Sequence, residues 1–168
     1  MAAFKLPKGL VLPLGGTAVA IALSLASFFE GTRYTAYQDV GGVWTICDGH
    51  TGPDVHPGMV ATKAQCDAYR AADVAVANAA VHRLITVPLT PMCEAGLTDF
   101  TLNTGSGTLA KSTPRRLFNA GDYEGGAKAL ELYHYAAGRD CRLSASQCAG
   151  IVVRRAVERW LCQLSPTP

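Results

Sequence analysis

An uncharged run of 21 residues near the N-terminus constrains the fold more than any other feature of the sequence. Residues 9–29 read "GLVLPLGGTAVAIALSLASFF", with Lys5 and Lys8 before them and Glu30 directly after them. A helix of about 20 residues spans roughly 30 Å, the thickness of a bilayer's hydrocarbon core. The lysines favour a cytoplasmic N-terminus. We therefore predict an N-terminal membrane segment over residues 1–29 and a separate domain over residues 30–168.

The run is only weakly hydrophobic, because small residues such as Gly15, Gly16 and Ala20 fill much of it and Pro13 interrupts its start. A helix of this composition gains less from lipid than a leucine-rich one. Four interpretations fit the run. They are a signal peptide cleaved near "SLA" at 24–26, a permanent anchor, an anchor that later leaves the bilayer, and a buried helix of a soluble protein.

Length and composition allow one compact domain with a terminal segment. The chain has 168 residues and a net charge of +2, which is too small to suggest nucleic acid as a partner. Six cysteines, an even number, are typical of disulfides formed in an oxidising compartment. No C-x-x-C pair or histidine pair has zinc-site spacing. The six residues are Cys47, Cys66, Cys93, Cys141, Cys148 and Cys162, and fifteen disulfide pairings are possible among them. We favour two of the bonds, Cys47 with Cys66 and Cys141 with Cys148.

The rest of the chain predicts a small β lobe followed by a larger helical lobe. Residues 34–47 alternate turn formers with aromatic and β-branched residues, which indicates a hairpin. Helix signals follow it: capping boxes at 62–65 and 144–147, and caps at 90–91, 113–114 and 122. The helix expected over 61–85 would join the lobes. The fold class is therefore α+β and mainly α.

The C-terminal helix is expected to bury one apolar face. That face comprises Val153, Val157, Trp160 and Leu161. The arginines around it, Arg139, Arg142, Arg154, Arg155 and Arg159, are interpreted as a solvated surface, with attraction to anionic lipid or cell wall as the alternative.

Glu30, Asp39 and Thr45 are the candidate catalytic residues. Glycoside hydrolysis needs one carboxyl group that holds a proton and one that is ionised. Glu30 follows "SFF", so we expect apolar neighbours that keep its proton in place at neutral pH. Asp39 lies in a polar turn, and the hydroxyl of Thr45 is suited to hold a water molecule.

Three segments together resemble the phage-type lysozymes, glycoside hydrolase family 24. The first, starting at Glu30, reads E-G-x-R-x-x-A-Y-x-D-x-x-G-x-W-T-I-x-x-G-H-T. The second, "GLTDFTLNTGSGTLAKSTPRRLFNAGDYEGGAKAL", is similar to the family's "SFxxNxGxGxxxxST" segment and its "N-x-GD" continuation. The third, "GIVVRRAVERWL", is similar to "GLxxRRxxExxL". The resemblance covers about residues 29 to 163.

The resemblance implies a lysozyme-like fold and hydrolysis of the β-1,4 bond between N-acetylmuramic acid and N-acetylglucosamine in peptidoglycan. Glu30 would be the general acid, Asp39 would orient or activate water or stabilise the transition state, and Thr45 would place the water. Inversion is implied, with carboxyl groups roughly 6.5 to 9.5 Å apart. Asn103 would bind substrate and His50 would be structural. No metal or cofactor and a monomeric state are expected.

Two departures from the family pattern stand near the site. Cys47 replaces a usual glycine, and Tyr133 replaces a usual tryptophan. A cysteine two residues after Thr45 leaves open that activity is gated by a change of disulfide partner. The uncharged run contains no cysteine to serve as that partner, which weighs against this alternative.

The position of Glu30 suggests why the uncharged run is there. It resembles the signal-anchor-release segment of some phage endolysins: in lipid it would hold Glu30 away from the cleft, and on release it would carry Glu30 into place. The enzyme would then move from the host inner membrane to the periplasm and lyse the host. The alternatives are a tethered peptidoglycan-binding protein without turnover and the same hydrolase with a cleaved signal peptide.

Overall fold

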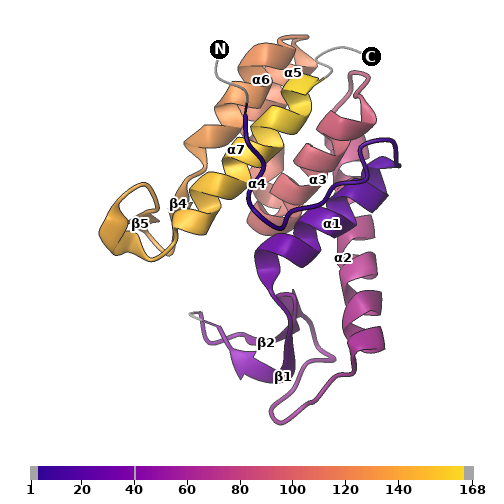
Figure 1. Cartoon of the computed structure of the whole chain (residues 1–168), viewed down its shortest axis with the longest axis vertical. Coiled ribbons are helices and arrows are strands. Elements are labelled where there is room, and N and C mark those ends of the chain that lie inside the picture. Colours follow the sequence, from indigo (N-terminus) through magenta and orange to yellow (C-terminus); the bar gives the residue numbers. More distant parts are fainter. Residues whose placement is uncertain (1–3, 40, 165–168) are drawn as a thin grey trace.

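The computed structural model describes residues 4–39 and 41–164, and Figure 1 shows a small β lobe below a larger helical lobe. The β lobe contains β1 (Arg33–Gln38), β2 (Trp44–Cys47) and β3 (His50–Thr51). The main helices are α1 (Ala18–Glu30), α2 (Lys63–Leu84), α3 (Pro91–Thr104), α4 (Ser106–Lys111), α5 (Thr113–Asn119), α6 (Tyr123–Ala129) and α7 (Ala149–Leu164). The short elements are η1 (Leu130–Leu132), β4 (Tyr135–Ala136), β5 (Arg139–Asp140) and η2 (Ser144–Ser146). The predicted α+β, mainly α, class is confirmed.

The β lobe is a three-stranded antiparallel sheet in the order β1-β2-β3. It follows α1 through Gly31, whose φ of +66° is readily adopted only by glycine. The links that fasten the sheet to α2 include the Cys47–Cys66 disulfide and a hydrogen bond of 2.9 Å between His50 Nδ1 and Asp73 Oδ2. The lobe is therefore held at both ends, by α1 and by α2.

Most of the predicted helix starts are present. Thr62 and Gln65 form both hydrogen bonds of a capping box before α2, and Thr90 caps α3 with Pro91 in its first turn. The box predicted at Ser144–Gln147 is wrong, because Ser144–Ser146 forms a separate 3-10 turn and α7 begins only at Ala149. Gln147 ends that turn with a φ of +58°, which breaks the continuity with α7.

The centre of the helical lobe is α3, which packs against α1, α2 and α7. Gly96 of α3 lies close against the backbone of α7. A Cβ atom at this residue would lie 2.9 Å from the main-chain oxygen of Glu158, which is closer than carbon and oxygen atoms pack. The absence of a side chain at Gly96 thus sets the spacing of the two helices.

The buried face of α7 differs from the predicted one. Val153 is 42% exposed, whereas Arg154, Val157, Glu158 and Leu161 are all buried. These four residues share one helix face at spacings of three and four, so two charged side chains occupy positions that usually carry apolar ones. The interpretation of Arg154 and Arg155 as solvated surface is wrong: they are 2% and 1% exposed.

The uncharged N-terminal run is divided in two. Residues 9–17 lie outside any helix, and Thr17 caps α1 by accepting a hydrogen bond from the amide of Ala20. Ile21 and Leu25 of α1 are completely buried, in a core shared with α3 and α7. Within the described residues, none of the helices has the length and apolar character needed to span a bilayer. The division into residues 1–29 and 30–168 stays a prediction.

All six cysteines form disulfides in the structure. The two favoured pairs, Cys47–Cys66 and Cys141–Cys148, are confirmed. The third bond joins Cys93 at the start of α3 to Cys162 at the end of α7. Bridging 69 residues of sequence, it fastens together the two helices that meet at Gly96.

We expect Gly96→Ala to lower the free energy of unfolding by about 1–3 kcal/mol, because the new methyl group forces α3 and α7 apart. Gly107→Ala is the matched control: it is helical and a Cβ atom there would meet no neighbouring atom within 4 Å, so it should be neutral or stabilising by up to about 1 kcal/mol. Urea unfolding of both variants measures the difference. Equal stability of the two would contradict the close approach.

Candidate active site

Glu30 is the last residue of α1 and stands where the helix gives way to the β lobe. Its Oε1 accepts a hydrogen bond from Nη1 of Arg154 on α7, and its side chain is 25% exposed. The neighbouring Phe29 ring lies 5.3 Å from the centre of the same guanidinium. The apolar surroundings expected from "SFF" are therefore only half present, because an arginine occupies the other side.

Arg154 is bound on its remaining sides by Asp99 of α3. Its Nε and Nη2 atoms donate to the two oxygens of Asp99, each at 2.8 Å. Burial alone would lower the pKa of Arg154, but the carboxylates of Asp99 and Glu30 raise it above its ordinary value, so the guanidinium stays charged. A fixed cation thus joins α1, α3 and α7 at the position of Glu30.

Two further charged residues of α7 lie behind Arg154. Arg155 Nη2 donates to Glu158 Oε1 at 2.7 Å, and the same Glu158 oxygen lies 3.8 Å from Arg154 Nε. Burial raises the pKa of Glu158 well above its usual range, with the Arg155 charge opposing it, and burial lowers the pKa of Arg155. We call the five residues Glu30, Asp99, Arg154, Arg155 and Glu158 the acid–arginine cluster.

Asp39 and Thr45 lie on the β lobe, and Val43 links them. Asp39 is exposed at the end of β1, where its Oδ1 accepts hydrogen bonds from the amides of Gly41 and Val43 at 2.8 and 2.9 Å. Thr45 is 3% exposed in β2, and its hydroxyl donates to the carbonyl of Val43 at 3.0 Å. The turn between β1 and β2 therefore fixes the orientation of both side chains.

Glu30 and Asn103 line one cleft of about 240 Å³ at the junction of α1, α3 and α7. Asn103 Oδ1 accepts a hydrogen bond of 2.9 Å from Arg155 Nη2, so the amide is oriented by the acid–arginine cluster. Asp39 and Thr45 are not among the residues that line this cleft. The structure thus brings together two of the four residues predicted to meet the substrate, with the other two on the adjoining sheet.

His50 is part of β3 and is not among the residues that line the cleft. Besides Asp73 it faces Asp54, with Nε2 at 3.4 Å from Oδ2, and its ring stacks on Tyr69 with centroids 4.0 Å apart. These contacts hold β3 against α2, which is what a structural role requires.

Sequence reasoning missed the roles of Arg154, which binds Glu30, and of Asp99, which binds Arg154. The available signal was the spacing of Arg154 and Glu158, which places both on the face of α7 that carries Val157 and Leu161. The departure at Cys47 has a local explanation: its φ is +56°, a conformation that favours glycine, and the disulfide to Cys66 holds it there.

The phage lysozyme family model matches residues 27–158 of the chain. The SAR-endolysins of Enterobacteria phages PA-2 and P21 are 35% and 34% identical to it over 164 residues, covering 94% of this chain and 95% of each relative. The expected resemblance to the phage-type lysozymes is therefore confirmed.

Solved structures agree with this result. An endolysin from Escherichia coli O157:H7 phage FAHEc1 superimposes with a TM-score of 0.72 at 32% identity, covering 88% of this chain and 93% of that one. The active form of the P1 phage endolysin Lyz has the same fold, with a TM-score of 0.74 at 22% identity over 89% of this chain and 87% of that one. The secreted inactive form of Lyz superimposes with a TM-score of only 0.51 at 19% identity, covering 67% of this chain and 76% of that one. The chain belongs to the phage lysozyme family and is a glycoside hydrolase of the lysozyme type.

Proposed function

We propose that this endolysin hydrolyses the β-1,4 bond between N-acetylmuramic acid and N-acetylglucosamine in peptidoglycan, with Glu30 as the general acid. The observation that carries the proposal is the position of Glu30. It is partly exposed at the edge of a cleft that also presents Asn103, while a buried arginine fixes its carboxyl group from behind. A proton donor needs this combination of access and fixed orientation.

Glu30 would donate its proton to the glycosidic oxygen as the bond to the anomeric carbon breaks. The hydroxyl of Thr45 already donates its hydrogen to Val43, so its oxygen is left to accept a hydrogen from the attacking water. That water would give its second hydrogen bond to Asp39, whose carboxylate would take up the proton released on attack. Water attacking from the β-lobe side, opposite Glu30, leads to inversion at the anomeric carbon. Asn103 would bind an N-acetyl group or the sugar backbone.

The N-terminal segment would control this activity by controlling where Glu30 lies. In the bilayer, residues 9–29 would be helical and Glu30 would be held at the membrane surface. On release, Ile21 and Leu25 would exchange lipid for the protein core, in which they are completely buried. Removing each side chain from water contributes about 2–3 kcal/mol of free energy in either environment. The free energies of the membrane-held and the packed states would then be nearly equal. This suits an anchor that has to leave the membrane.

The proposed route therefore starts at the host inner membrane, with a cytoplasmic N-terminus, and ends with a monomer free in the periplasm. Two observations support release over cleavage of a signal peptide. The segment that cleavage would remove supplies Leu10, Ile21 and Leu25 to the core, and α1 carries Glu30 at its end. A tethered binding protein without turnover has no need for the arrangement around Glu30.

We expect Glu30→Gln to lower the rate of peptidoglycan hydrolysis by at least about 10²-fold, because the amide cannot donate the proton that the leaving oxygen requires. Release of reducing sugar ends from purified peptidoglycan measures the rate, and circular dichroism confirms the fold. Glu124→Gln, an exposed carboxylate on α6, is the matched control and should keep the full rate. A fully active Glu30→Gln variant would remove Glu30 from the mechanism.

We expect the triple change Gly15→Leu, Gly16→Leu and Ala20→Leu to trap the protein in the membrane fraction and delay lysis. In the folded state Gly15 is exposed, so a leucine there gains nothing from packing, whereas in lipid it gains about 2 kcal/mol. Cell fractionation and the time of lysis are the two measurements. Serine at the same three positions is the control and should leave release unchanged. Lysis on schedule by the leucine variant would show that release does not limit activity.

A further inference from the structure

Asp99 introduces a buried negative charge behind the residue that holds Glu30. It is completely buried on α3, and its two oxygens bind Arg154 side-on. In the segment "DFTLNTGSG" this aspartate stands where the family pattern "SFxxNxGxG" begins with serine. A serine would accept hydrogen bonds from the guanidinium without adding a charge.

The charge has a consequence for Glu30, because the two carboxylates share one cation. A guanidinium whose only carboxylate partner is Glu30 would strongly favour its ionised form, which is useless as a proton donor. The carboxylate of Asp99 occupies two of the three nitrogens of Arg154, leaving Nη1 for Glu30. Its negative charge also offsets part of the positive charge that Glu30 meets.

The other charged groups near Glu30 do not replace Asp99 in offsetting the charge of Arg154. Burial raises the pKa of Glu158 well above the usual range, which favours its neutral form, and its hydrogen bond comes from Arg155. Asp48 on the β lobe is bound by Thr32 Oγ1 at 2.6 Å and by Arg70 of α2. Asp99 and Glu30 are therefore the two carboxyl groups that accept hydrogen bonds from Arg154.

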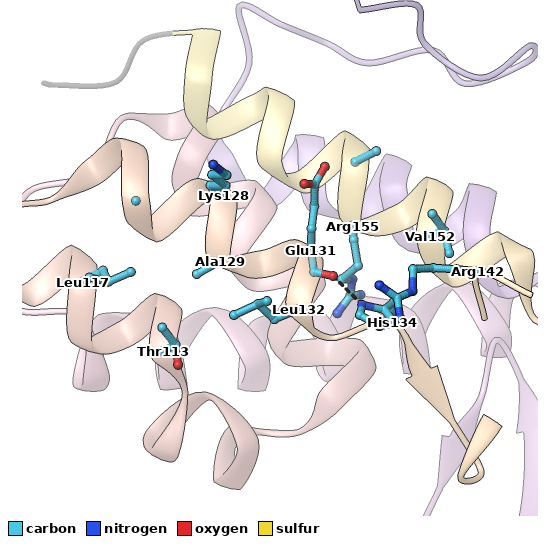
Figure 2. A pocket seen from close by; sticks show the side chains of 12 residues that line it. Thr113, Leu117, Lys128, Ala129, Glu131, Leu132, His134, Arg142, Val152 and Arg155 are labelled. Carbon is cyan, nitrogen blue, oxygen red and sulfur yellow. Dashed lines mark hydrogen bonds between the residues drawn. The ribbon is translucent and has the colours of Figure 1, made fainter. Parts of the chain in front are cut away.

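Arg155 lines a different cavity from Glu30. This cavity, of about 650 Å³, is also lined by His134, and Figure 2 labels both side chains. The Nη2 atom of Arg155 binds Asn103 and Glu158. Arg154 is thus the cation that donates directly to Glu30, and Asp99 is the carboxylate that binds Arg154 through two of its nitrogens.

We propose that Asp99 is a positioning residue of the active site that sets the upper pH limit of activity by keeping Arg154 from holding Glu30 in its ionised form. This inference rests on the proposed role of Glu30 as general acid. Of the two carboxyl groups on Arg154, the partly exposed Glu30 is the one that exchanges protons with solvent and meets the substrate. Asp99 has no exposed surface and lies out of reach of the substrate.

The test is the pH dependence of kcat/KM for Asp99→Asn, measured on soluble peptidoglycan fragments at constant ionic strength. Asparagine keeps the shape and one acceptor while removing the charge. Loss of a nearby negative charge stabilises ionised Glu30, so the proton is lost at lower pH. We expect the alkaline limb of the profile to move to lower pH by about one unit or more. Asp99→Ser provides a second measurement if the asparagine variant does not fold.

Glu158→Gln is the matched control, since it changes an equally buried carboxyl group whose hydrogen bond comes from Arg155 and keeps the acceptor for that bond. We expect its alkaline limb not to move. An unshifted limb in folded Asp99→Asn, at a normal or a uniformly lower rate, would overturn the inference and leave Asp99 a purely structural role. A folded Asp99→Asn variant with no activity at any pH would overturn it as well. Failure of the proposed function is a separate result, because it would appear as activity in Glu30→Gln.

Discussion

The site depends on a single guanidinium that binds carboxylates from two other helices. Arg154 on α7 binds Asp99 of α3 through two nitrogens and Glu30 of α1 through the third. Arginine suits this task because its donors form a rigid planar fork that remains charged when it is buried. Removing either acid would leave buried charge without its partner, which is costly, so the three helices are fixed relative to one another at the place where catalysis is proposed.

This interaction makes the fold of the N-terminal segment part of the active site. Glu30 reaches Arg154 only because α1 is packed on α3 and α7, with Ile21, Leu25 and Val157 completely buried at that contact. Gly96 and the Cys93–Cys162 disulfide set how closely α3 and α7 approach. The same apolar residues that would hold residues 9–29 in lipid hold α1 in the protein core. In the proposed release, such a weakly hydrophobic segment would serve both states, and the position of the Glu30 carboxyl group would distinguish them.

Much of the fold could be predicted from local signals in the sequence. The hairpin, the capping box at Thr62 and the proline start at Pro91 depend on neighbouring residues, and the structure contains all three. The fold class and family followed from motif spacing. The surroundings of Glu30 could not be predicted in this way, because Arg154 lies 124 residues away and contacts it only through tertiary packing. Arginines on α7 were interpreted as solvated because burial of a charge is favourable only with partners, and the partner Asp99 is on a different helix. The roles of Glu30, Asp39 and Thr45 remain proposals that their positions support.

In the proposed mechanism, the enzyme is active only when α1 is packed and Glu30 binds Arg154. The most direct measurement compares, per molecule, the hydrolysis of soluble peptidoglycan fragments by the membrane-held protein in right-side-out vesicles and by the same protein after release. Soluble fragments reach both forms equally, so access to the substrate does not differ. We expect the membrane-held form to hydrolyse the fragments no faster than Glu30→Gln, and we expect release to restore the full rate of hydrolysis. Equal rates before and after release would contradict the mechanism, because Glu30 would then be in place while the segment is still in the bilayer.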